Sequence, residues 1–140
     1  MSWLITGGTG FVGQALTRRA LADGKDVRLA LRRPVEHAAA HGLMVGQIDS
    51  QTRWQAALDG VDTVFHLAAR VHVMNEKASD PLTAFRDVNT AGTLNLARQA
   101  AAAGVRRLVF LSSIKVNGEH TAPGRPFAAN LPARPEDPYG

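Results

Sequence analysis

The 140-residue sequence predicts an α/β fold in which helices cover both faces of a parallel β-sheet. Two patterns support this prediction. Short apolar stretches alternate with helical stretches along the chain, and parallel strands require such crossovers. The first apolar stretch also runs directly into a glycine-rich segment, residues 6–13, and a helical pattern follows at once. With a glycine turn after the first strand, we expect a doubly wound, Rossmann-like sheet with strand order 3-2-1-4-5.

The first half of the chain contains three predicted strands and one long helix. The helix ends at Asp23-Gly24, and the second strand alternates apolar and polar residues until it is stopped at Pro34. Residues 35–42 contain alanines and histidines, and their pattern is ambiguous between secondary-structure types. The predicted elements are the strand Trp3–Thr6, the helix Val12–Ala22, the strand Val27–Leu31 and the short strand Leu43–Ile48.

The second half continues the alternation. Gly60 ends a short helix, Pro81 stands at the start of a long Ala-rich helix, and Gly104 closes that helix. The predicted elements are the helix Trp54–Leu58, the buried strand Asp62–Ala68, the helix Leu82–Ala103 and the fifth strand Arg107–Ser112. Five of the seven prolines then fall between Pro123 and Pro138 without periodicity. Such a segment in a compact domain is usually functional or disordered.

Composition and charge narrow the class of protein. A hydrophobic content of 45% with 20% charged residues is ordinary for a globular domain. No apolar run approaches the roughly 20 residues of a membrane span, and no secretory signal precedes Ser2-Trp3, so we expect no membrane association. The chain has no cysteine, which excludes disulfides and fits a cytoplasmic location. The net charge of +4 arises in part from arginine pairs in different elements, and only 6% of residues are aromatic, so a nucleic-acid partner is unsupported.

The glycine-rich segment has the physical features of a phosphate-binding turn. One glycine permits the sharp turn, a second allows a pyrophosphate to approach the backbone, and a third lets the helix pack on the strand. The unpaired N–H groups and the dipole of the helix favour an anion at this point. Gly7, Gly10 and Gly13 fit these roles, although Gly8, Gly10 and Gly13 fit an alternative spacing. A glycine-rich turn without a ligand is the simpler interpretation.

Four motifs, in order, resemble the extended short-chain dehydrogenases/reductases. They are TGGTGFVG, VDTVFHLAAR, VNTAGTLNLARQAAAAGVRRLVFLSS and DPYG. Within that superfamily the chain is similar to the NAD-dependent epimerase/dehydratase family, whose members act on nucleotide-linked sugars. The segments ARVHVMNE and SSIKVNGE resemble the 4-epimerase-like and 4-keto-reductase members. The resemblance implies that residues 1–113 form an NAD(P)-binding domain and that residues 114–140 form a Pro/Gly-rich active-site loop ending at the catalytic tyrosine.

The resemblance assigns cofactor contacts to several positions. The pyrophosphate and the adjoining ribose would be held by Gly7, Thr9, Gly10, Phe11, Val12 and Gly13. Gln47 and Ile48 stand where many relatives place Asp-Ile or Asp-Leu against the adenine, and Asp49 comes one residue late. The strand end Leu67, Ala68 and Ala69 would line the adenosine and the nicotinamide ribose, or simply pack at the end of the sheet. Asn89 would organise cofactor or water, and Ser112 would lie near the nicotinamide.

Arg32 and Arg33 follow the second predicted strand, where the family selects its cofactor. An acidic side chain at this point binds the ribose hydroxyls of NAD, whereas an arginine accommodates the 2′-phosphate of NADP. Guanidinium groups bind phosphate through bidentate, charge-assisted hydrogen bonds. We therefore hypothesise a preference for NADP(H). If the two arginines are only solvated charges, NAD(H) is the alternative.

The resemblance gives Ser113 the role of orienting the substrate hydroxyl and Tyr139 that of general acid/base. In the family a lysine four residues after the tyrosine helps to tune its pKa, which is about 10 in free tyrosine. This chain stops at Gly140, so we expect a truncated N-terminal portion that lacks the substrate lobe and is inactive alone. A disordered tail is the simpler interpretation of Tyr139. His66 and His72 have no carboxylate or cysteine at ligand spacing, so we predict structural histidines and no metal site.

The sequence therefore predicts an NAD(P)-dependent nucleotide-sugar epimerase or 4-keto-sugar reductase that transfers a hydride at a sugar carbon. A nucleotide-diphosphate sugar would be the partner, and a homodimer through the long helix Leu82–Ala103 is a further interpretation. The competing interpretation is a non-catalytic NADP-binding sensor or scaffold. Net consumption of reduced nicotinamide would indicate a reductase, because an epimerase regenerates its cofactor.

Overall fold

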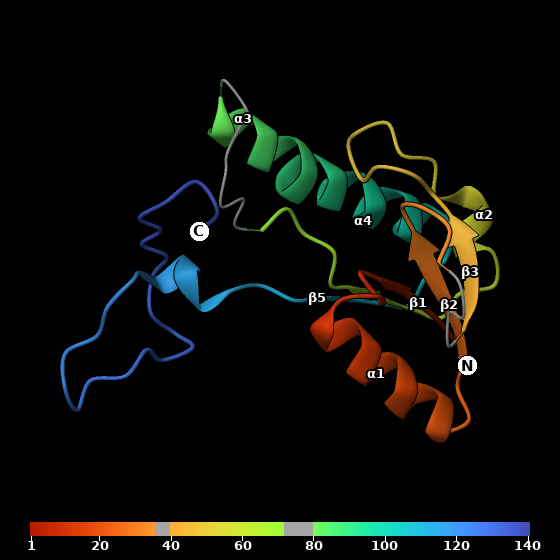
Figure 1. Ribbon diagram of the computed structural model, residues 1–140, viewed down its shortest axis with the longest axis horizontal. Coiled ribbons are helices and arrows are strands. Elements are labelled where there is room, and N and C mark those ends of the chain that lie inside the picture. Colours follow the sequence, from red (N-terminus) through yellow and green to blue (C-terminus); the bar gives the residue numbers. More distant parts are fainter. Residues whose placement is uncertain (36–39, 72–79) are drawn as a thin grey trace.

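The computed structural model describes residues 1–35, 40–71 and 80–140. Within them, five parallel strands form a sheet with the order β3-β2-β1-β4-β5, which confirms the predicted topology. Helices lie on both faces of this sheet (Figure 1). The strands are β1 Ser2–Thr6, β2 Asp26–Leu31, β3 His41–Met44, β4 Thr63–His66 and β5 Arg107–Phe110.

The helices divide between the two faces of the sheet. Helix α1, Phe11–Ala22, covers one face. Helix α2, Gln55–Leu58, lies on the other side with α3, Pro81–Phe85, and α4, Thr93–Ala102 (Figure 1). The helical segment after Pro81 is continuous but changes its winding: α3, Pro81–Phe85, leads into a π-helical stretch, η1, Arg86–Gly92, and then into α4, Thr93–Ala102. Arg86 and Gly92 both keep αR backbone angles at these junctions.

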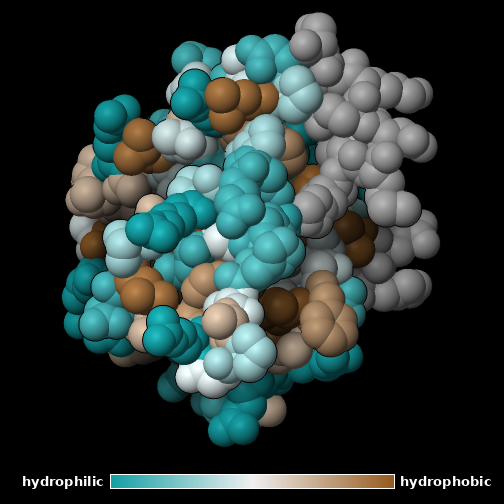
Figure 2. Space-filling view, turned by 90° about the vertical axis from the view of Figure 1, so that its left-hand side faces the viewer, coloured by the Kyte–Doolittle hydropathy of each residue, from teal (hydrophilic) through white to brown (hydrophobic). Residues whose placement is uncertain are grey.

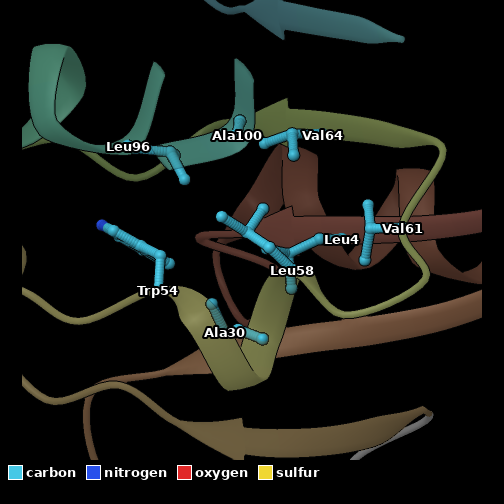
Figure 3. Close-up of a cluster of buried hydrophobic side chains, with 9 residues drawn as sticks. Leu4, Ala30, Trp54, Leu58, Val61, Val64, Leu96 and Ala100 are labelled. Atoms are coloured by element: carbon cyan, nitrogen blue, oxygen red, sulfur yellow. The ribbon is translucent and has the colours of Figure 1, made fainter. Parts of the chain in front are cut away.

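Two apolar clusters hold the helices to the sheet. Successive residues of a strand point to opposite faces, so Leu4 belongs to the cluster under α2 and α4, and Ile5 belongs to the cluster under α1. In the first cluster the fully buried Trp54 lies among Leu58 and Leu96 (Figure 3). Burial on both faces is typical of a parallel sheet with crossover helices.

The strand register brings the ends of the three central strands to one edge. Thr6 at the end of β1 pairs with Ala30 near the end of β2 and with His66 at the end of β4. The chain leaves each strand at this edge, and the glycine turn follows Thr6 directly. In open α/β sheets, ligands bind outside the carboxyl ends of the strands, where the strand order reverses.

Several predicted bounds were wrong in instructive ways. The third strand was predicted at Leu43–Ile48, but β3 is His41–Met44, because Gly46 adopts a φ of +73° and turns the chain. The strands β4 and β5 end at His66 and Phe110, earlier than the apolar patterns indicated. In both cases the following residues leave the sheet at the edge where the candidate site lies.

The C-terminal segment extends past the end of β5 toward the start of α3 (Figure 1). It begins with the 3₁₀-helix η2, Ile114–Asn117, and has no further helix or strand. On this side of the molecule, apolar side chains form separate spots among polar ones (Figure 2). No helix in the described ranges has both the length and the apolarity needed to cross a bilayer.

Candidate functional site

A cavity of about 500 Å³ opens at the carboxyl edge of β1, β2 and β4. This volume lies within the range of roughly 300–1,000 Å³ that is typical of small-molecule sites. The wall combines the glycine turn with the chain that follows β2, β3 and β4. The described residues that line the cavity are Gly7, Thr9, Gly10, Ala30, Leu31, Arg32, Arg33, Val35, Val45, Gly46, Gln47, Ile48, Leu67, Ala68, Ala69 and Val88.

The glycine turn packs too tightly to accept side chains at two of its positions. Gly7 has a φ of +68°, and a Cβ there would lie 2.7 Å from the backbone nitrogen of Ala68. A Cβ on Gly13 would overlap the carbonyl oxygen of Gly7. The backbone nitrogen of Gly10 donates to that same carbonyl at 3.0 Å and closes the turn. The turn therefore forms a tightly packed cradle of backbone groups at the N-terminus of helix α1.

The first turn of α1 is left without acidic or capping side chains. Gly10 is the N-cap residue and supplies no side-chain hydrogen bond. The first N–H groups of a helix have no partner within the helix, and together with the helix dipole they favour an anion. The Phe11 side chain is 95% exposed, so Phe11, Val12 and Gly13 contribute backbone rather than side chains here. These three residues do not line the cavity, unlike Gly7, Thr9 and Gly10.

The described part of the cavity wall carries positive charge. Arg32 and Arg33 line it immediately after β2, where the sequence placed a cofactor selector. Among its described lining residues, there is no carboxylate. Asp49, two residues after Gln47 in the sequence, makes a hydrogen bond within its own turn: its Oδ1 accepts from the backbone nitrogen of Gln51 at 2.7 Å. The wall therefore attracts negative charge at the end of β2.

Gln47 and Ile48 reach the cavity on a loop that is fixed by internal hydrogen bonds. The Thr52 hydroxyl donates to the carbonyl oxygen of Gln47 at 2.7 Å and accepts from the backbone nitrogen of Asp49 at 2.9 Å. Gly92 packs against the loop, since a Cβ on it would lie 2.8 Å from Cγ2 of Ile48. These contacts support the loop where it lines the cavity.

Helix α4 anchors the same loop through two amide side chains. Nδ2 of Asn95 donates to the carbonyl oxygen of Thr52 at 2.8 Å, and Nε2 of Gln99 donates to it at 2.9 Å. Oε1 of Gln99 accepts from the backbone nitrogen of Trp54 at 2.9 Å. These bonds satisfy partly buried backbone groups and tie the wall of the cavity to the helix.

His66 is the buried centre of a hydrogen-bond network behind the glycine turn. The Thr6 hydroxyl oxygen accepts from the backbone nitrogens of Leu67 at 3.2 Å and Ala68 at 3.1 Å. Its proton is therefore available to Nδ1 of His66 at 2.7 Å. Nε2 of His66 must then carry the ring proton and donate to the Thr93 hydroxyl at 2.9 Å. The network links β1, β4 and α4, which agrees with the predicted structural role.

Burial controls the charge of this histidine. His66 is 1% exposed, and desolvation lowers its pKa from the usual 6.5 to about 4. The ring is therefore neutral at pH 7, which its hydrogen bonds also require. His72 lies outside the described residues. In the ranges that the structure describes, no three acidic or histidine side chains come together in a way that could hold a metal ion.

Asn89 holds the chain that leaves the cavity after β4. Its Oδ1 accepts from the backbone nitrogen of Arg70 at 2.7 Å, and its Nδ2 donates to the carbonyl oxygen of Arg70 at 2.9 Å. Asn89 stands in the π-helical stretch η1, a geometry frequent at functional sites. Asn89 does not line the cavity but fixes the residue that follows Ala69 in its wall.

Ser113 and Tyr139 lie outside the cavity lining. Ser113 caps η2, and its Oγ accepts from the backbone nitrogen of Lys115 at 3.3 Å. Tyr139 is half-buried, with its ring centroid 6.1 Å from that of Phe85, and the Arg70 guanidinium lies 5.4 Å from the Phe85 centroid. This cluster is continuous with the cavity wall, because Arg70 follows Ala69 directly in the chain. Ser112 is exposed beyond β5.

Sequence reasoning missed part of the wall and one aromatic contact. The missed lining residues are Ala30, Leu31, Val35, Val45, Gly46 and Val88. Ala30 and Leu31 were discoverable as the last residues of a predicted parallel strand. Val88 and Phe85 carried no signal, because apolar residues on a long Ala-rich helix are ordinary core candidates.

The residues of the site suit an extended anionic ligand with a flat apolar part. The uncapped helix terminus and the glycine cradle would hold phosphate groups, and the arginines would hold a second negative group. The small residues Ala68 and Ala69 and the apolar Ile48 would contact rings. A dinucleotide has this distribution of charge and apolar surface.

Comparison with known proteins identifies a family for this chain. The family model described as "NAD dependent epimerase/dehydratase family" matches residues 3–140. The chain is 46% identical over 140 residues to a UDP-glucose 4-epimerase of Vibrio cholerae, covering 99% of this chain and 43% of that protein. It is 39% identical over 122 residues to sterol demethylase protein B of Methylococcus capsulatus, covering 84% of this chain and 36% of that one.

A solved structure shows the same fold. A short-chain dehydrogenase/reductase superfamily protein from Agrobacterium tumefaciens, crystallised with bound NAD, superposes with a TM-score of 0.83 at 32% identity. The match covers 99% of this chain and 40% of that one. The chain thus spans about two fifths of the length of these proteins.

Proposed function

Since the chain belongs to the NAD-dependent epimerase/dehydratase family, we propose that its cavity binds a nicotinamide dinucleotide and that the whole protein transfers a hydride at a carbon of a nucleotide-linked sugar. The observation that carries the proposal is the cavity at the carboxyl edge of β1, β2 and β4. There the glycine cradle, the uncapped start of α1 and two arginines face one space. This arrangement matches the charge pattern of a dinucleotide.

In this proposal each part of the wall holds one part of the cofactor. The cradle Gly7–Gly13 holds the pyrophosphate, and Gln47 and Ile48 contact the adenine. Leu67, Ala68 and Ala69 contact the adenosine and the nicotinamide ribose. Their backbone is fixed by the Thr6 hydroxyl, which accepts from two of their nitrogens.

Arg32 and Arg33 support a preference for the phosphorylated cofactor. They line the cavity just beyond β2, and in the described wall no carboxylate stands ready to accept hydrogen bonds from ribose hydroxyls. A guanidinium gains more from the 2′-phosphate of NADP than from a hydroxyl. The NAD bound in the Agrobacterium tumefaciens structure is a property of that protein and does not decide the cofactor of this chain.

Ser113 and Tyr139 are the residues we propose for the proton chemistry. A nicotinamide cofactor held in the cavity would supply the hydride chemistry at the sugar carbon. The Tyr139 hydroxyl exchanges the proton of the reacting sugar hydroxyl, and the Ser113 hydroxyl holds that oxygen. The Asn89 side chain supports this region by fixing both backbone groups of Arg70 beside Phe85.

The coverage and identity of two relatives support one substrate class over another. The similarity to a UDP-glucose 4-epimerase covers 99% of the chain at 46% identity, whereas that to a sterol demethylase protein covers 84% at 39%. We therefore propose a nucleotide-diphosphate sugar over a sterol. Between the two sugar reactions, the overall likeness favours 4-epimerisation, and the arginine pair favours a reduction that consumes NADPH.

Calorimetric titration of the 140-residue chain with NADPH and with NADH tests the cofactor proposal. We expect both to bind and NADPH to bind more tightly. The double variant Arg32→Asp with Arg33→Ala should reverse the ratio of the two affinities, while Arg18→Ala, an exposed change on the outer side of α1, should leave it unchanged. An unchanged ratio in the double variant would contradict the selector role, and absence of binding would contradict the proposed function.

Turnover by the whole protein tests the reaction. With UDP-glucose and catalytic amounts of cofactor, an epimerase produces the 4-epimer without net loss of reduced-nicotinamide absorbance. A reductase consumes one NADPH for each 4-keto sugar. Turnover of a 3-hydroxysteroid with no reaction of any nucleotide sugar would contradict the proposed substrate class.

A further inference from the structure

Two segments that are far apart in the sequence pack together beyond β5. The backbone nitrogen of Arg134 donates to the carbonyl oxygen of Val116 at 2.8 Å. The backbone nitrogen of Glu119 donates to Oε1 of Glu136 at 3.2 Å. Near the end of the chain, a Cβ on Gly140 would lie 2.8 Å from the carbonyl oxygen of Lys115. The segment that bears Tyr139 is therefore folded back onto the turn that follows Ser113.

Lys115 provides the charge that joins these segments. Its Nζ lies 2.6 Å from Oδ2 of Asp137 and 2.7 Å from Oε1 of Glu119. The lysine side chain is 23% exposed, so water screens the pairs only partly. The hydrogen bond to Asp137 raises the pKa of Lys115, and the same bond lowers the pKa of Asp137. Both groups are therefore charged at neutral pH.

Asp137 connects Lys115 to the backbone around Tyr139, because its two carboxylate oxygens bond different groups. While Oδ2 accepts from Lys115, Oδ1 accepts from the backbone nitrogen of Gly140 at 2.7 Å. These two bonds lie on either side of Tyr139 in the chain. The Tyr139 ring meets Phe85 of α3 at an interplanar angle of 57°. The Asp137 carboxylate thus fixes the backbone on both sides of Tyr139, and the Tyr139 ring lies against Phe85 at the end of α3.

Lys115 also contacts the turn of Ser113, because its backbone nitrogen donates to Oγ of Ser113 at 3.3 Å. We propose that Lys115 is a positioning residue that couples the two hydroxyl-bearing positions, Ser113 through its backbone and Tyr139 through Asp137. The inference rests on the function proposed above for Ser113 and Tyr139. We name the contact of Lys115 with Asp137 the Lys115–Asp137 latch.

Glu119 provides an internal control for the latch. It contacts the same ammonium group, but from within the same turn, four residues along the chain. Among the described residues its carboxylate bonds Lys115 and not residues 137–140, so its loss removes an ion pair of Lys115 without freeing Tyr139. The latch thus predicts different results for two carboxylates that lie at nearly equal distances from one ammonium group.

The chain has a single tyrosine, so a tyrosine-specific signal reports on Tyr139 alone. We would incorporate fluorotyrosine into the 140-residue chain and record the ¹⁹F resonance of the native chain, of the chain unfolded in denaturant and of four variants. The variants are Lys115→Met, Lys115→Arg, Asp137→Asn and Glu119→Gln. Tryptophan fluorescence, which reports on Trp54 on one face of the sheet and Trp3 on the other, would show that the sheet of each variant is folded.

The latch predicts a native resonance displaced from that of the unfolded chain. Lys115→Met should move it to the unfolded position while the sheet stays folded, and Lys115→Arg should restore the native position. Asp137→Asn keeps an acceptor for Gly140 but loses its charge, so it should give an intermediate shift. Glu119→Gln should keep the native position. A native resonance at the unfolded position, or a Lys115→Met variant that is indistinguishable from the native chain, would overturn the inference.

Addition of NADPH or NADH to the same samples separates this inference from the proposed function. If the latch and the function both hold, the cofactor binds and shifts the Tyr139 resonance further in the native chain but not in Lys115→Met. If neither cofactor binds while the variants behave as described, the latch stands and the proposed function fails. Binding of cofactor with no effect of Lys115→Met on the resonance would overturn the latch alone.

Discussion

Gly13 and Gly10 lie in the same turn but differ in how much room surrounds them. A Cβ on Gly13 would overlap the Gly7 carbonyl, whereas a Cβ on Gly10 would lie 3.3 Å from it. Gly10 also has a φ of −79°, which any residue can adopt. Gly13 is therefore required for packing within the protein, whereas Gly10 can be required only for the approach of a ligand.

We predict that Gly13→Ala lowers the free energy of unfolding by about 1–3 kcal/mol, the usual cost of overpacking. Gly10→Ala should change the free energy of unfolding by less than this. It should weaken dinucleotide binding, because the added methyl group would lie in the cavity at the N-terminus of α1. Denaturant unfolding measures the first effect, and calorimetric titration measures the second. Equal stability of the two variants would contradict the packing role of Gly13.

His66 gives a pH-dependent prediction with a defined sign. Its pKa is about 4 in the folded chain and about 6.5 in the unfolded chain, so below pH 6.5 the unfolded state binds the proton more readily. The free energy of unfolding should therefore fall by roughly 3 kcal/mol between pH 7 and pH 4. The carboxyl groups with lowered pKa values, such as that of Asp62, lose their contribution only at lower pH.

The matched variants are His66→Gln and His41→Gln, measured by denaturant unfolding at several pH values. Glutamine at position 66 can accept from Thr6 and donate to Thr93 without titrating. His66→Gln should flatten the slope between pH 6.5 and 4, while His41→Gln, at an exposed position on the edge strand, should retain it. The same slope in His66→Gln would show that another group titrates in this window.

At the residue level, the sequence predicted the positions with distinctive chemistry. Arg32, Gln47 and Ala68, which the sequence analysis assigned to a cofactor, line the cavity. The charge of Arg32, the register of Gln47 with relatives and the small size of Ala68 at a strand end led to those assignments. Lys115 carried no such mark: its partner Asp137 lies 22 residues away, in a segment without periodicity. Contacts between irregular segments have no sequence period, so only the folded chain displays them.

Helix α4 secures the wall of the cavity through its polar side. Gln99 supplies an acceptor to the backbone of Trp54 and a donor to the backbone of Thr52. Both backbone groups are partly buried, and an unpaired group of this kind costs roughly 1–3 kcal/mol. The apolar side of the same helix contributes Leu96 and Ala100 to the core.

We predict that Gln99→Ala lowers the free energy of unfolding by about 1–3 kcal/mol and also weakens dinucleotide binding, since the loop bearing Gln47 and Ile48 loses an anchor. Arg98→Ala, an exposed neighbour on α4, should change stability by less than about 0.5 kcal/mol. Unfolding curves and cofactor titrations of the folded variants test both statements. A destabilised Gln99→Ala variant with native cofactor affinity would contradict the link between α4 and the cavity.

Element types and order followed from the sequence, whereas the winding of the long helix did not. A single helix was predicted over Leu82–Ala103, and the π-helical stretch Arg86–Gly92 interrupts it. Asn89 within that stretch bonds the backbone of Arg70, and Gly92 packs on the loop of Ile48. Both are tertiary contacts, which helix propensity and periodicity do not encode.

On the scale of the whole molecule, the two faces of the sheet carry separate reporters. Trp54 lies in the cluster under α2 and α4, and Trp3 lies on the opposite face, with its ring centroid 4.6 Å from that of Phe65. The shared strands β1 and β4 contribute side chains to both clusters. Loss of either cluster therefore exposes the strands that support the other, and we expect the faces to unfold together.

The variants Trp3→Phe and Trp54→Phe each leave one tryptophan, so fluorescence follows one face at a time. In each variant the denaturant midpoints from fluorescence and from far-UV circular dichroism should coincide. The cavity is built from chain that follows β1, β2 and β4, so bound dinucleotide should raise both midpoints together. At 100 times its Kd, the ligand should add about 2.7 kcal/mol to the free energy of unfolding. A midpoint that rises on one face alone would mean that the two clusters are not coupled through the sheet.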